Sequence, residues 1–448
     1  MASGKDRFSS KTGFVLALAG SAIGLGNIWR FPYMVGEYGG AAFIIIYILC
    51  SLLLSVPIFY CELIVGRKKS ETGLGSGKPG LDIKLVGLFC AVTCFIIASF
   101  YSVVGGWSLD YLGMSLVKGF RDVSTSGVEA AFSQATTSPL QALASFFLFL
   151  GLTALIVRLG VGKGIEKFSK ISIPVLILIM VALAIYSVTL PGASAGINYL
   201  VHPDFSKVTG KTITYAMGQA FFSLSVGQGT IMTYSLYMSR KDNMVTSGLL
   251  TAGFDTMFAI IAGFVIMPAV FSAGIEPGAG PALIFETVPY IFGTIGRTAP
   301  LFGRILLVLF FLSVFTAALT SEISVFECCV TKLREKISMS RNKACTVVFI
   351  LVSVLGSLCA LSFGVLSEVK IAGKIIFDFF ENLSSTYMLS IGALMFSLFV
   401  GWRMGKKEVY NYFTNGGTVN VRVFKLFYAI VKWVSPIGIV LIFVSNLF

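Results

Sequence analysis

The stretch Gly20-Ser-Ala-Ile-Gly-Leu-Gly-Asn-Ile-Trp-Arg-Phe-Pro32 lies inside the first long apolar segment of the chain. Its closely spaced glycines weaken a helix, because glycine loses more backbone freedom on folding than any other residue. A second stretch of this kind, Ser225-Val-Gly-Gln-Gly229, lies inside the sixth apolar segment. Glycine also supports close packing of membrane helices, so glycine alone leaves two interpretations open, a packing surface or a break in the helix.

Apolar residues dominate the whole chain, which has 448 residues, 56% of them hydrophobic and 12% charged. This is too little polar surface to cover a soluble protein, so the composition favours an all-α integral membrane protein in a lipid bilayer. A helix that crosses about 30 Å of hydrocarbon needs about 20 apolar residues. We expect 11 spans, over residues 12–36, 40–66, 84–117, 140–158, 167–190, 212–238, 244–273, 298–331, 343–363, 373–402 and 424–447.

The net charge of +13 lies in short loops whose content of Lys and Arg alternates along the chain. Loops rich in these residues stay in the cytoplasm. The side that carries Lys5, Arg67 and Lys332 is therefore predicted to be inside, with the amino terminus cytoplasmic and the carboxyl terminus external. Because this charge sets orientation, no nucleic-acid partner is expected. The cysteines lie within or at the ends of apolar segments and are predicted to be free thiols.

The two glycine-rich stretches occupy corresponding places, in the first and the sixth span. An internal repeat of five spans requires this spacing, and repeats of an odd number of spans have opposite orientations in the membrane. We expect one membrane transporter domain over residues 1–448, with repeats over about 12–190 and 212–402 and an extra span over about 424–447. Unwound segments inside a membrane are tolerated only where protein, water or a ligand takes up their backbone groups.

Side-chain oxygens gather around both breaks. Asn27 follows the first break, Ser223 precedes the second, and later spans add Asp255 and the run Thr320-Ser-Glu322. Hydroxyl, amide and sparse carboxylate oxygens suit a hard monovalent cation, whereas zinc or copper would require histidine or thiolate ligands. The single histidine, His202, lies in a loop, so these residues favour sodium.

Four motifs together resemble the neurotransmitter:sodium symporter family, which includes bacterial amino-acid carriers with the leucine-transporter fold. The similarity extends over nearly the whole chain, and the combination of motifs is highly specific. The motifs are Gly20-Ser-Ala-Ile-Gly-Leu-Gly-Asn-Ile-Trp-Arg-Phe-Pro32, Ser99-Phe-Tyr-Ser-Val-Val-Gly-Gly-Trp107, Gly218-Gln-Ala-Phe-Phe-Ser-Leu-Ser-Val-Gly-Gln-Gly229 and Thr316-Ala-Ala-Leu-Thr-Ser321.

The resemblance implies two sodium sites built from backbone and side-chain oxygens. Sodium site 1 would combine the carboxylate of the substrate with Ala22 (carbonyl), Asn27, Ser223 and Asp255. Sodium site 2 would combine Gly20, Ile23 and Ala317 (carbonyls) with Thr320 and Ser321. Without the resemblance, hydrogen bonds to their own helix explain Thr320 and Ser321 equally well.

Asp255 departs from the family pattern, because the leucine carrier has asparagine there and the animal members pair a neutral residue with a bound chloride. We hypothesise that the Asp255 carboxylate supplies the negative charge that chloride supplies elsewhere, so no chloride is expected. Ala259, one turn further on, also lacks the serine that helps to hold chloride. The alternative is a structural ion pair, for which Arg30 is the one basic residue in spans one, six and seven.

Gly24 favours an amino acid over a biogenic amine as substrate. In the monoamine carriers of the family an aspartate at this place pairs with the amine, whereas glycine leaves room for a carboxylate to reach sodium. The carboxylate would also meet the amino-terminal end of a half-helix at Leu25 and the hydroxyl of Tyr101. The implied substrate site consists of Ser21, Ala22, Gly24, Leu25, Gly26, Ile97, Tyr101, Phe222, Ser223, Ser225, Gln228, Ser321 and Val325.

Gln228 and Val325 make the implied pocket larger and more polar than that of the leucine carrier, which has phenylalanine and isoleucine there. We therefore expect tyrosine or tryptophan ahead of leucine, although Gln228 is equally well explained as a cap of the broken helix. Glu62 and Glu322 lie inside spans without an assigned partner. For Glu322, a proton carrier and a protonated hydrogen-bond donor both stay open.

Two charged pairs match the gates of the family. Arg30 and Glu381 match the external gate, above a lid that includes Phe222, and a charge pair of this kind can close a vestibule by small motions. Lys5 and Glu335 match the internal gate. That second match is weaker, since surface pairs between loops are common.

Other functions fit the residues less well. An enzyme is not expected, because the chain has neither HExxH nor GxSxG, and the glycine loop 75–80 fits GxGxxG without a preceding strand. A channel would require a continuous pore with repeated selectivity elements. An amino-acid sensor that moves nothing stays open as an alternative. The span count and short external loops favour a bacterial inner membrane, while the sodium stoichiometry and the oligomeric state stay open.

Overall fold

The structure is a computed structural model that describes residues 7–71, 81–117, 124–239, 242–274, 283–419 and 422–445. Two features named above lie outside these ranges, Lys5 of the internal charged pair and the glycine loop 75–80. The described chain is helical almost throughout, with one short β-hairpin.

The described elements follow one another along the chain with short connections. The α-helices are Lys11–Ala22 (α1), Phe31–Glu37 (α2), Ala41–Cys50 (α3), Val56–Glu71 (α4), Leu81–Val117 (α5), Thr125–Thr137 (α6), Pro139–Arg158 (α7), Lys167–Ser187 (α8), Ala193–Val201 (α9), Gly210–Ser223 (α10), Thr230–Ser235 (α11), Met244–Ser272 (α12), Val288–Thr298 (α13), Pro300–Ile337 (α14), Arg341–Leu361 (α15), Ile376–Asn382 (α16), Leu389–Leu398 (α17), Lys406–Phe413 (α18), Phe424–Ala429 (α19) and Ser435–Ser445 (α20). Wider π-type turns are Gly26–Arg30 (η1), Ser51–Ser55 (η2), Val161–Glu166 (η3), Leu283–Thr287 (η5), Leu383–Met388 (η6), Phe399–Arg403 (η7) and Ile430–Val434 (η8), and Phe205–Lys207 (η4) is a 3₁₀ turn. The antiparallel strands are Lys370–Ile371 (β1) and Lys374–Ile375 (β2).

Most of the predicted spans are present as long apolar helices. Within the described ranges, 9 continuous helices are long and apolar enough to cross a membrane, and the bent pair Lys11–Ala22 and Gly26–Glu37 makes a tenth crossing, with an angle of 52° at its break. The segment predicted over 212–238 is divided between the short helices α10 and α11. The break in the first segment is confirmed, and the total of eleven spans with an inverted repeat stays a prediction.

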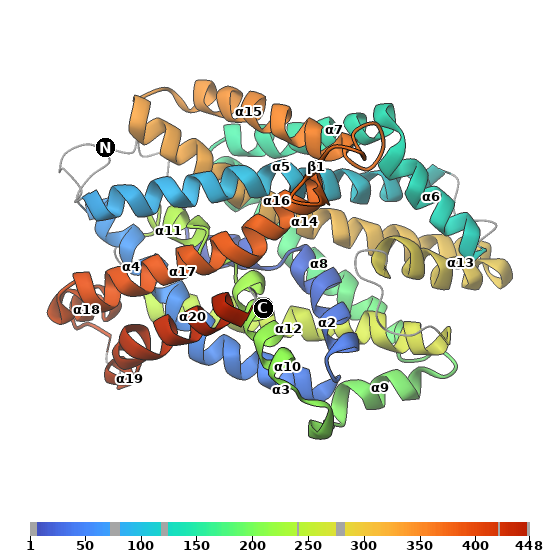
Figure 1. Ribbon diagram of the computed structural model, residues 1–448, viewed down its shortest axis with the longest axis horizontal. Coiled ribbons are helices and arrows are strands. Elements are labelled where there is room, and N and C mark those ends of the chain that lie inside the picture. The colour runs from blue at the N-terminus through green and yellow to red at the C-terminus, as the bar shows by residue number, and fades with distance from the viewer. Residues whose placement is uncertain are drawn as a thin grey trace.

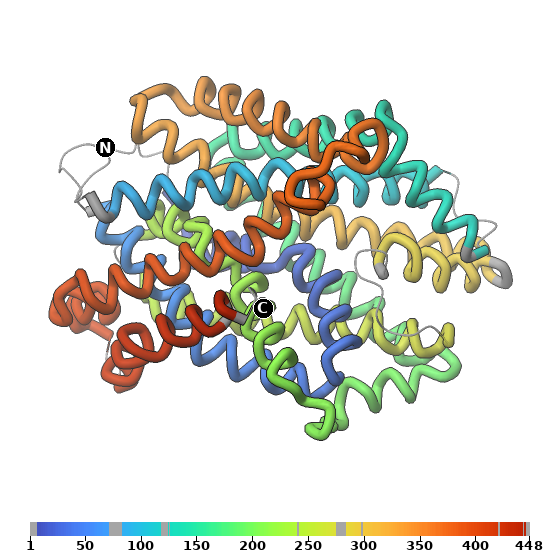
Figure 2. Tube along the Cα trace, viewed as in Figure 1, coloured from blue at the N-terminus to red at the C-terminus, as the bar shows by residue number. Residues whose placement is uncertain are grey.

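The helices form an elongated bundle around α5 and α14, which pack along each other through its middle (Figure 1). Helices α7 and α15 cover one side of this pair, while α8 and α12 pack against α1. Helices α6, α9 and α13 gather at one end of the bundle, and α18 and α19 lie at the other (Figure 1). The trace in Figure 2 shows α10, in green, ending inside the bundle at the second break.

The surface of the bundle differs from that of a soluble protein, although the core is apolar in both. Large apolar side chains on the outside of the bundle are well exposed, for example Leu49 (52%), Leu178 (70%) and Val354 (65%). Charged side chains such as Glu62 and Asp255 are fully buried instead. An apolar exterior around polar interior sites is what a lipid environment requires. The cysteines are free, as predicted.

Candidate functional site

The first helix break leaves two backbone N–H groups without helical partners, and side chains accept both. Helix α1 ends at Ala22, and Ile23 is extended with ψ of 102°. The Gly24 N–H donates to Asn27 Oδ1 at 3.0 Å, and the Leu25 N–H donates to the Tyr101 hydroxyl at 3.1 Å. Satisfied backbone groups allow a broken helix to persist inside a membrane protein.

Close neighbours explain the glycines at this break. A Cβ atom on Gly24 would lie 2.5 Å from Ser321 Oγ and 2.9 Å from the Tyr101 hydroxyl oxygen. A Cβ atom on Gly26 would lie 2.7 Å from the Phe222 ring. These distances exclude a larger residue unless its neighbours move. The glycines therefore allow the broken segment to approach α5, α10 and α14.

The second break has a left-handed backbone and a carboxylate that binds its free ends. Ser225, Gly227 and Gly229 have φ of 53°, 91° and 81°, which favours glycine at such positions. Glu62 on α4 accepts from the Gly227 N–H at 2.7 Å and from the Met232 N–H at 3.2 Å. The sequence analysis found no partner for Glu62. In the structure its carboxylate accepts hydrogen bonds from backbone N–H groups on both sides of the second break.

Three of the four residues predicted for sodium site 1, Asn27, Ser223 and Asp255, meet at the buried Asp255 carboxylate, while Ala22 lines the cavity described below. Asn27 Nδ2 donates to Asp255 Oδ1 at 2.8 Å, and the Ser223 hydroxyl donates to Asp255 Oδ2 at 2.8 Å. Tyr47 on α3, which the sequence analysis did not single out, lies within hydrogen-bonding distance of both Ser223 and Asp255. All four side chains have 0% exposure. We call this set the Asp255 cluster.

The Asp255 cluster offers oxygen ligands and a single negative charge. Among the described residues, no basic side chain lies within 4.0 Å of the Asp255 carboxylate, which disfavours a structural ion pair. Nor do three or more His, Cys, Asp or Glu side chains gather anywhere in the described ranges to hold a metal ion. The donor chemistry fits a hard monovalent cation such as sodium.

The residues predicted for sodium site 2 meet where α14 crosses the end of α1. Ser321 Oγ lies 3.3 Å from the Gly20 carbonyl oxygen and 3.2 Å from that of Ile23. Thr320 Oγ1 donates within its own helix, to Thr316 and to Ala317 at 3.0 Å each. Thr320 thus bonds within its own helix, which was one of the two interpretations left open above. Ser321, in contrast, contacts carbonyl oxygens of the first segment. We call this set the Ser321 cluster.

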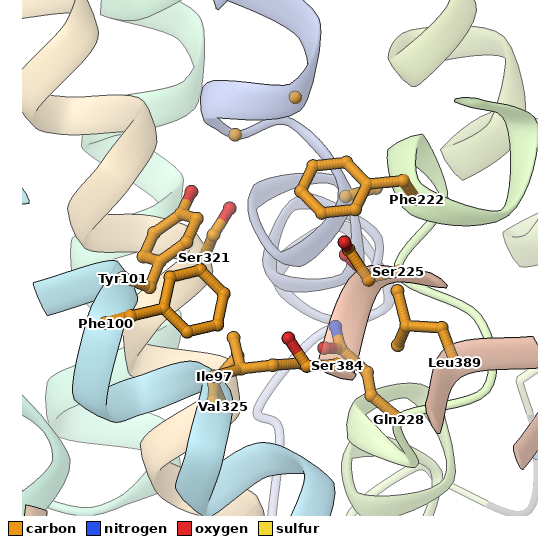
Figure 3. A pocket seen from close by; sticks show the side chains of 14 residues that line it. Ile97, Phe100, Tyr101, Phe222, Ser225, Gln228, Ser321, Val325, Ser384 and Leu389 are labelled. Carbon is orange, nitrogen blue, oxygen red and sulfur yellow. The ribbon is translucent and has the colours of Figure 1, made fainter. Parts of the chain in front are cut away.

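A small cavity of about 40 Å³ lies between the two breaks (Figure 3). Most of the predicted substrate residues line it: Ala22, Gly24, Gly26, Ile97, Tyr101, Phe222, Ser225, Gln228, Ser321 and Val325. Of the others, Leu25 lines a second cavity, Ser223 belongs to the Asp255 cluster, and Ser21 bonds to Ser324.

Sequence reasoning missed four residues of this lining, Phe100, Ser384, Ser385 and Leu389. Phe100 adjoins the predicted Tyr101, so a search of neighbouring positions on that helix would have found it. Ser384 and Ser385 lie in the wide turn η6 and Leu389 begins α17. No motif marks these residues, because only the packing of the chain brings them to the pocket.

A larger cavity of about 250 Å³ adjoins the first and shares Gly26, Phe100, Tyr101 and Phe222 with it. Arg30, Asp378 and Glu381 are among its lining residues. The aromatic rings of Tyr101 and Phe222 therefore form part of the wall that the two chambers have in common. This arrangement resembles a vestibule above an enclosed site.

The predicted external gate pair lines this vestibule without touching. Among the described residues no ion pair within 4.0 Å joins Arg30 to Glu381; instead the Arg30 guanidinium carbon lies 4.7 Å from the centroid of the Phe222 ring. Arg30 Nη1 is buried without a hydrogen-bond partner. Glu381 accepts from the Ser385 hydroxyl at 3.0 Å. The direct pair implied by the resemblance is thus absent from this arrangement of the chain.

The inner charged residue Glu335 has a partner that the sequence analysis did not name, and its predicted pair with Lys5 stays a prediction. Glu335, whose predicted partner Lys5 lies outside the described residues, pairs with Lys69 on α4 at 2.6 Å. Nearby, the Tyr237 hydroxyl donates to Glu327 at 2.9 Å, and Arg341 forms a buried ion pair with the same carboxylate. Sequence reasoning did not pair Glu327 with Arg341, because no motif marks either residue, although α15 begins four residues after the end of α14.

Glu322 is buried beside the Ser321 cluster. Its Oε1 accepts from the Ser102 hydroxyl of α5 at 3.1 Å, and its Oε2 has no hydrogen-bond partner in the described chain. Both functions considered for Glu322 therefore stay open.

Comparison with known proteins now identifies the family. The profile of the sodium:neurotransmitter symporter family matches residues 5–125 and 130–448. An uncharacterized sodium-dependent transporter of Bacillus subtilis, YhdH, is 35% identical over 98% of this chain and 97% of its own length. An uncharacterized sodium-dependent transporter of Haemophilus influenzae is 33% identical over 99% and 98%.

A solved structure agrees with the sequence relatives. The crystal structure of MhsT in complex with L-phenylalanine is 37% identical, covers 99% of this chain and 100% of its own, and superposes with a TM-score of 0.88. The broken helices, the two oxygen clusters and the pocket between them accordingly belong to a multi-pass membrane transporter, and this chain is a member of the sodium:neurotransmitter symporter family.

Proposed function

We propose that this protein is a sodium-coupled symporter of a hydrophobic or aromatic amino acid, with tyrosine or tryptophan favoured over leucine. The observation that carries the proposal is the meeting of two broken helices around one enclosed pocket, with an oxygen cluster on either side of the first break. The co-crystallised phenylalanine of MhsT supports an amino-acid substrate.

The backbone of the substrate would bind to the broken helices. Its carboxylate would lie near the amino-terminal end of the half-helix that starts at Gly26, where the backbone dipole favours an anion. The Tyr101 hydroxyl, which accepts from the Leu25 N–H, still has its own proton to donate to that carboxylate. The ammonium group would bind carbonyl oxygens of the unwound segments.

Two sodium ions would enter with the substrate. The first would bind at the Asp255 cluster with the Ala22 carbonyl and the substrate carboxylate, so that its binding and that of the substrate reinforce each other. The second would bind at the Ser321 cluster, among the carbonyl oxygens at the end of α1. Because Asp255 already supplies a fixed negative charge, transport would not require chloride.

Transport would proceed by alternating access in one membrane domain with inverted repeats. Arg30 and Glu381 would approach each other above Phe222 when the vestibule closes. On the other side, loosening around α1 and Glu335 would open a path to the cytoplasm. We place the protein in a bacterial inner membrane with the amino terminus inside and the carboxyl terminus outside, by its basic loops.

Uptake by proteoliposomes tests this function. Radiolabelled tryptophan, tyrosine and leucine are supplied with an inward sodium gradient, with potassium in place of sodium, and with gluconate in place of chloride. We expect uptake that requires sodium, is insensitive to gluconate and is faster for the aromatic substrates. Binding without sodium-driven uptake would favour a sensor, and loss of uptake in gluconate would overturn the assignment to Asp255 alone.

A further inference from the structure

Lys432 is a charged residue inside an apolar helical segment that is long enough to cross a membrane, Phe424–Leu441. It lies in the π-type turn η8, roughly 12 Å along the helix axis from Phe424 at 1.5 Å per residue. Among the described residues, no carboxylate lies within 4.0 Å of Lys432 Nζ. A lysine inside a span is costly unless a partner compensates its charge or the side chain reaches the membrane surface.

Two exposed tryptophans surround this lysine. Lys432 Nζ lies 4.8 Å from the centroid of the Trp402 ring and 5.5 Å from that of the Trp433 ring. The Trp402 indole N–H donates to the Lys432 carbonyl at 3.0 Å, which fixes the ring beside the lysine. The exposed fractions of the two tryptophans are 53% and 54%. Exposed indoles on a membrane protein mark the level of the lipid headgroups, so this group of side chains faces lipid.

A second lysine lies along the same helix face. Lys406 Nζ is 5.7 Å from the centroid of the Tyr428 ring. Tyr428 precedes Lys432 by four residues, and side chains with this spacing are neighbours on a helix. The carboxylate closest to Lys406 in sequence, that of Glu408, pairs with Lys68 at 2.9 Å. Within the described chain, the two ammonium groups therefore share one face without a compensating carboxylate.

The backbone beneath these side chains is closely packed. A Cβ atom on Gly401 in η7 would lie 3.0 Å from Lys432 Cα, so only glycine allows η7 to approach η8 this closely. The Ser397 hydroxyl donates to the Val431 carbonyl at 2.6 Å across the same contact. Helices α17 and α20 pack against each other and lead toward α18 and α19 at one end of the bundle (Figure 1). The site is thus preformed, at a distance from the broken helices.

We infer that Lys406 and Lys432, together with Trp402 and Trp433, bind the headgroup of an anionic phospholipid. The ammonium groups supply charge and N–H donors for the phosphate, and the indoles suit the boundary between headgroup and acyl chain. Exposed apolar side chains on the same helix, Leu426 and Val434 among them, continue the surface for the acyl chains. A zwitterionic choline lipid fits less well, because its quaternary ammonium would lie beside two lysines.

Quenching of tryptophan fluorescence by brominated lipid tests this site directly. The chain has four tryptophans, of which Trp107 is buried and Trp29 lines the second cavity. Brominated acyl chains should therefore quench mainly Trp402 and Trp433. The full-length protein is reconstituted in phosphatidylcholine that contains brominated phosphatidylglycerol, or the same fraction of brominated phosphatidylcholine. Because one lysine near an anionic headgroup favours binding about fivefold, we expect the anionic lipid to bind at least fivefold more strongly.

Variants connect this preference to the two lysines. Lys432→Gln is expected to reduce the preference for phosphatidylglycerol about fivefold, and Lys406→Gln by a smaller factor because Lys406 is more exposed to water. Lys432→Arg keeps the charge and should keep the preference. Lys343→Gln is the matched control, since Lys343 is an exposed lysine at the start of α15, which packs against α5 and α7. The elution profile in detergent checks that each variant is folded.

The possible outcomes separate this site from the transport function. Equal binding of the two brominated lipids by the native protein would overturn the inference. A preference that is unchanged in both Lys432→Gln and Lys406→Gln would show that the basic surface in general attracts the lipid, and would overturn the assignment to these residues. If Lys432→Gln does not fold, Lys406→Gln in the Lys432→Arg background decides in the same way. Uptake of amino acids does not enter this test, so failure of the proposed function would leave its result unaffected.

Discussion

The two oxygen clusters differ in charge although both lie against the first helix break. The Asp255 cluster contains a carboxylate that accepts from Asn27 and Ser223, and every member is fully buried. In the Ser321 cluster the hydroxyl contacts are with neutral carbonyl oxygens at the end of α1. The interior of one membrane protein thus holds a charged site and a dipolar site, separated by a few residues of unwound chain.

This difference in charge predicts how strongly each cluster depends on its cation and on its individual ligands. A buried charge without a counterion is costly, so the Asp255 cluster is expected to depend strongly on its cation. The neutral groups of the Ser321 cluster can form hydrogen bonds within the protein when no cation is bound. Thr320, for example, donates to a carbonyl of its own helix. Removing one neutral ligand from the Ser321 cluster should therefore weaken sodium binding less than removing the carboxylate from the Asp255 cluster.

The largest effect is expected at the residue that lies between the two clusters. Gly24→Ala would place a carbon 2.5 Å from Ser321 Oγ and would push α1 away from α14. We expect uptake to fall to background while the protein still elutes as a single species. Gly253→Ala is the control, because a carbon there would meet no neighbouring atom within 4 Å. Full uptake by Gly24→Ala would show that the two clusters need not meet at this break.

Asp255→Asn removes the charge and keeps the shape of the side chain. Because hydrogen bonds to a charged group are worth about 1.5–3 kcal/mol, we expect sodium-driven uptake to fall about 10- to 100-fold. If the carboxylate takes the place of chloride, chloride should partly restore this variant and leave the native protein unaffected.

The control for Asp255→Asn is Thr251→Val, one turn earlier on the same helix. Thr251 is buried and bonds only within α12. A native protein that requires chloride, or an Asp255→Asn variant as active as the native protein, would contradict the charged role.

A smaller effect is expected at the neutral site. Thr320→Ala removes one hydroxyl that already bonds to its own helix, so the sodium concentration for half-maximal uptake is expected to rise about three- to tenfold, with the maximal rate nearly kept. Ser313→Ala on the same helix is the control, since Ser313 also bonds to its own helix and lies outside the cluster. A loss as large as that of Asp255→Asn would remove the distinction between the two sites.

Both breaks were predictable because glycines, side-chain oxygens and the spacing of the two segments coincide there, whereas glycine alone fits a packing surface equally well. The Asp255 and Ser321 clusters were predictable only through the resemblance, since a serine or threonine in a helix is equally well explained by a local bond. Tyr47, Glu62 and Ser384 acquire their roles from helices that are distant in sequence, and no local pattern marks such contacts.

The charged residues were the least predictable part. Arg30 lies over Phe222 without an ion pair to Glu381, and Glu335 has a partner, Lys69, that no motif indicated. Long charged side chains choose among several partners at similar cost, so motif matching alone does not determine their pairing. The free state of the cysteines, in contrast, was predicted directly from their positions in apolar segments.

The entry of radioactive sodium into proteoliposomes tests the coupling of the two clusters to the substrate most directly. Coupled transport predicts that external tryptophan accelerates sodium entry in the native protein, and that Gly24→Ala abolishes this acceleration. Linkage also requires that tryptophan tighten sodium binding by the same factor by which sodium tightens tryptophan binding. Sodium entry that is the same with and without an amino acid would contradict symport.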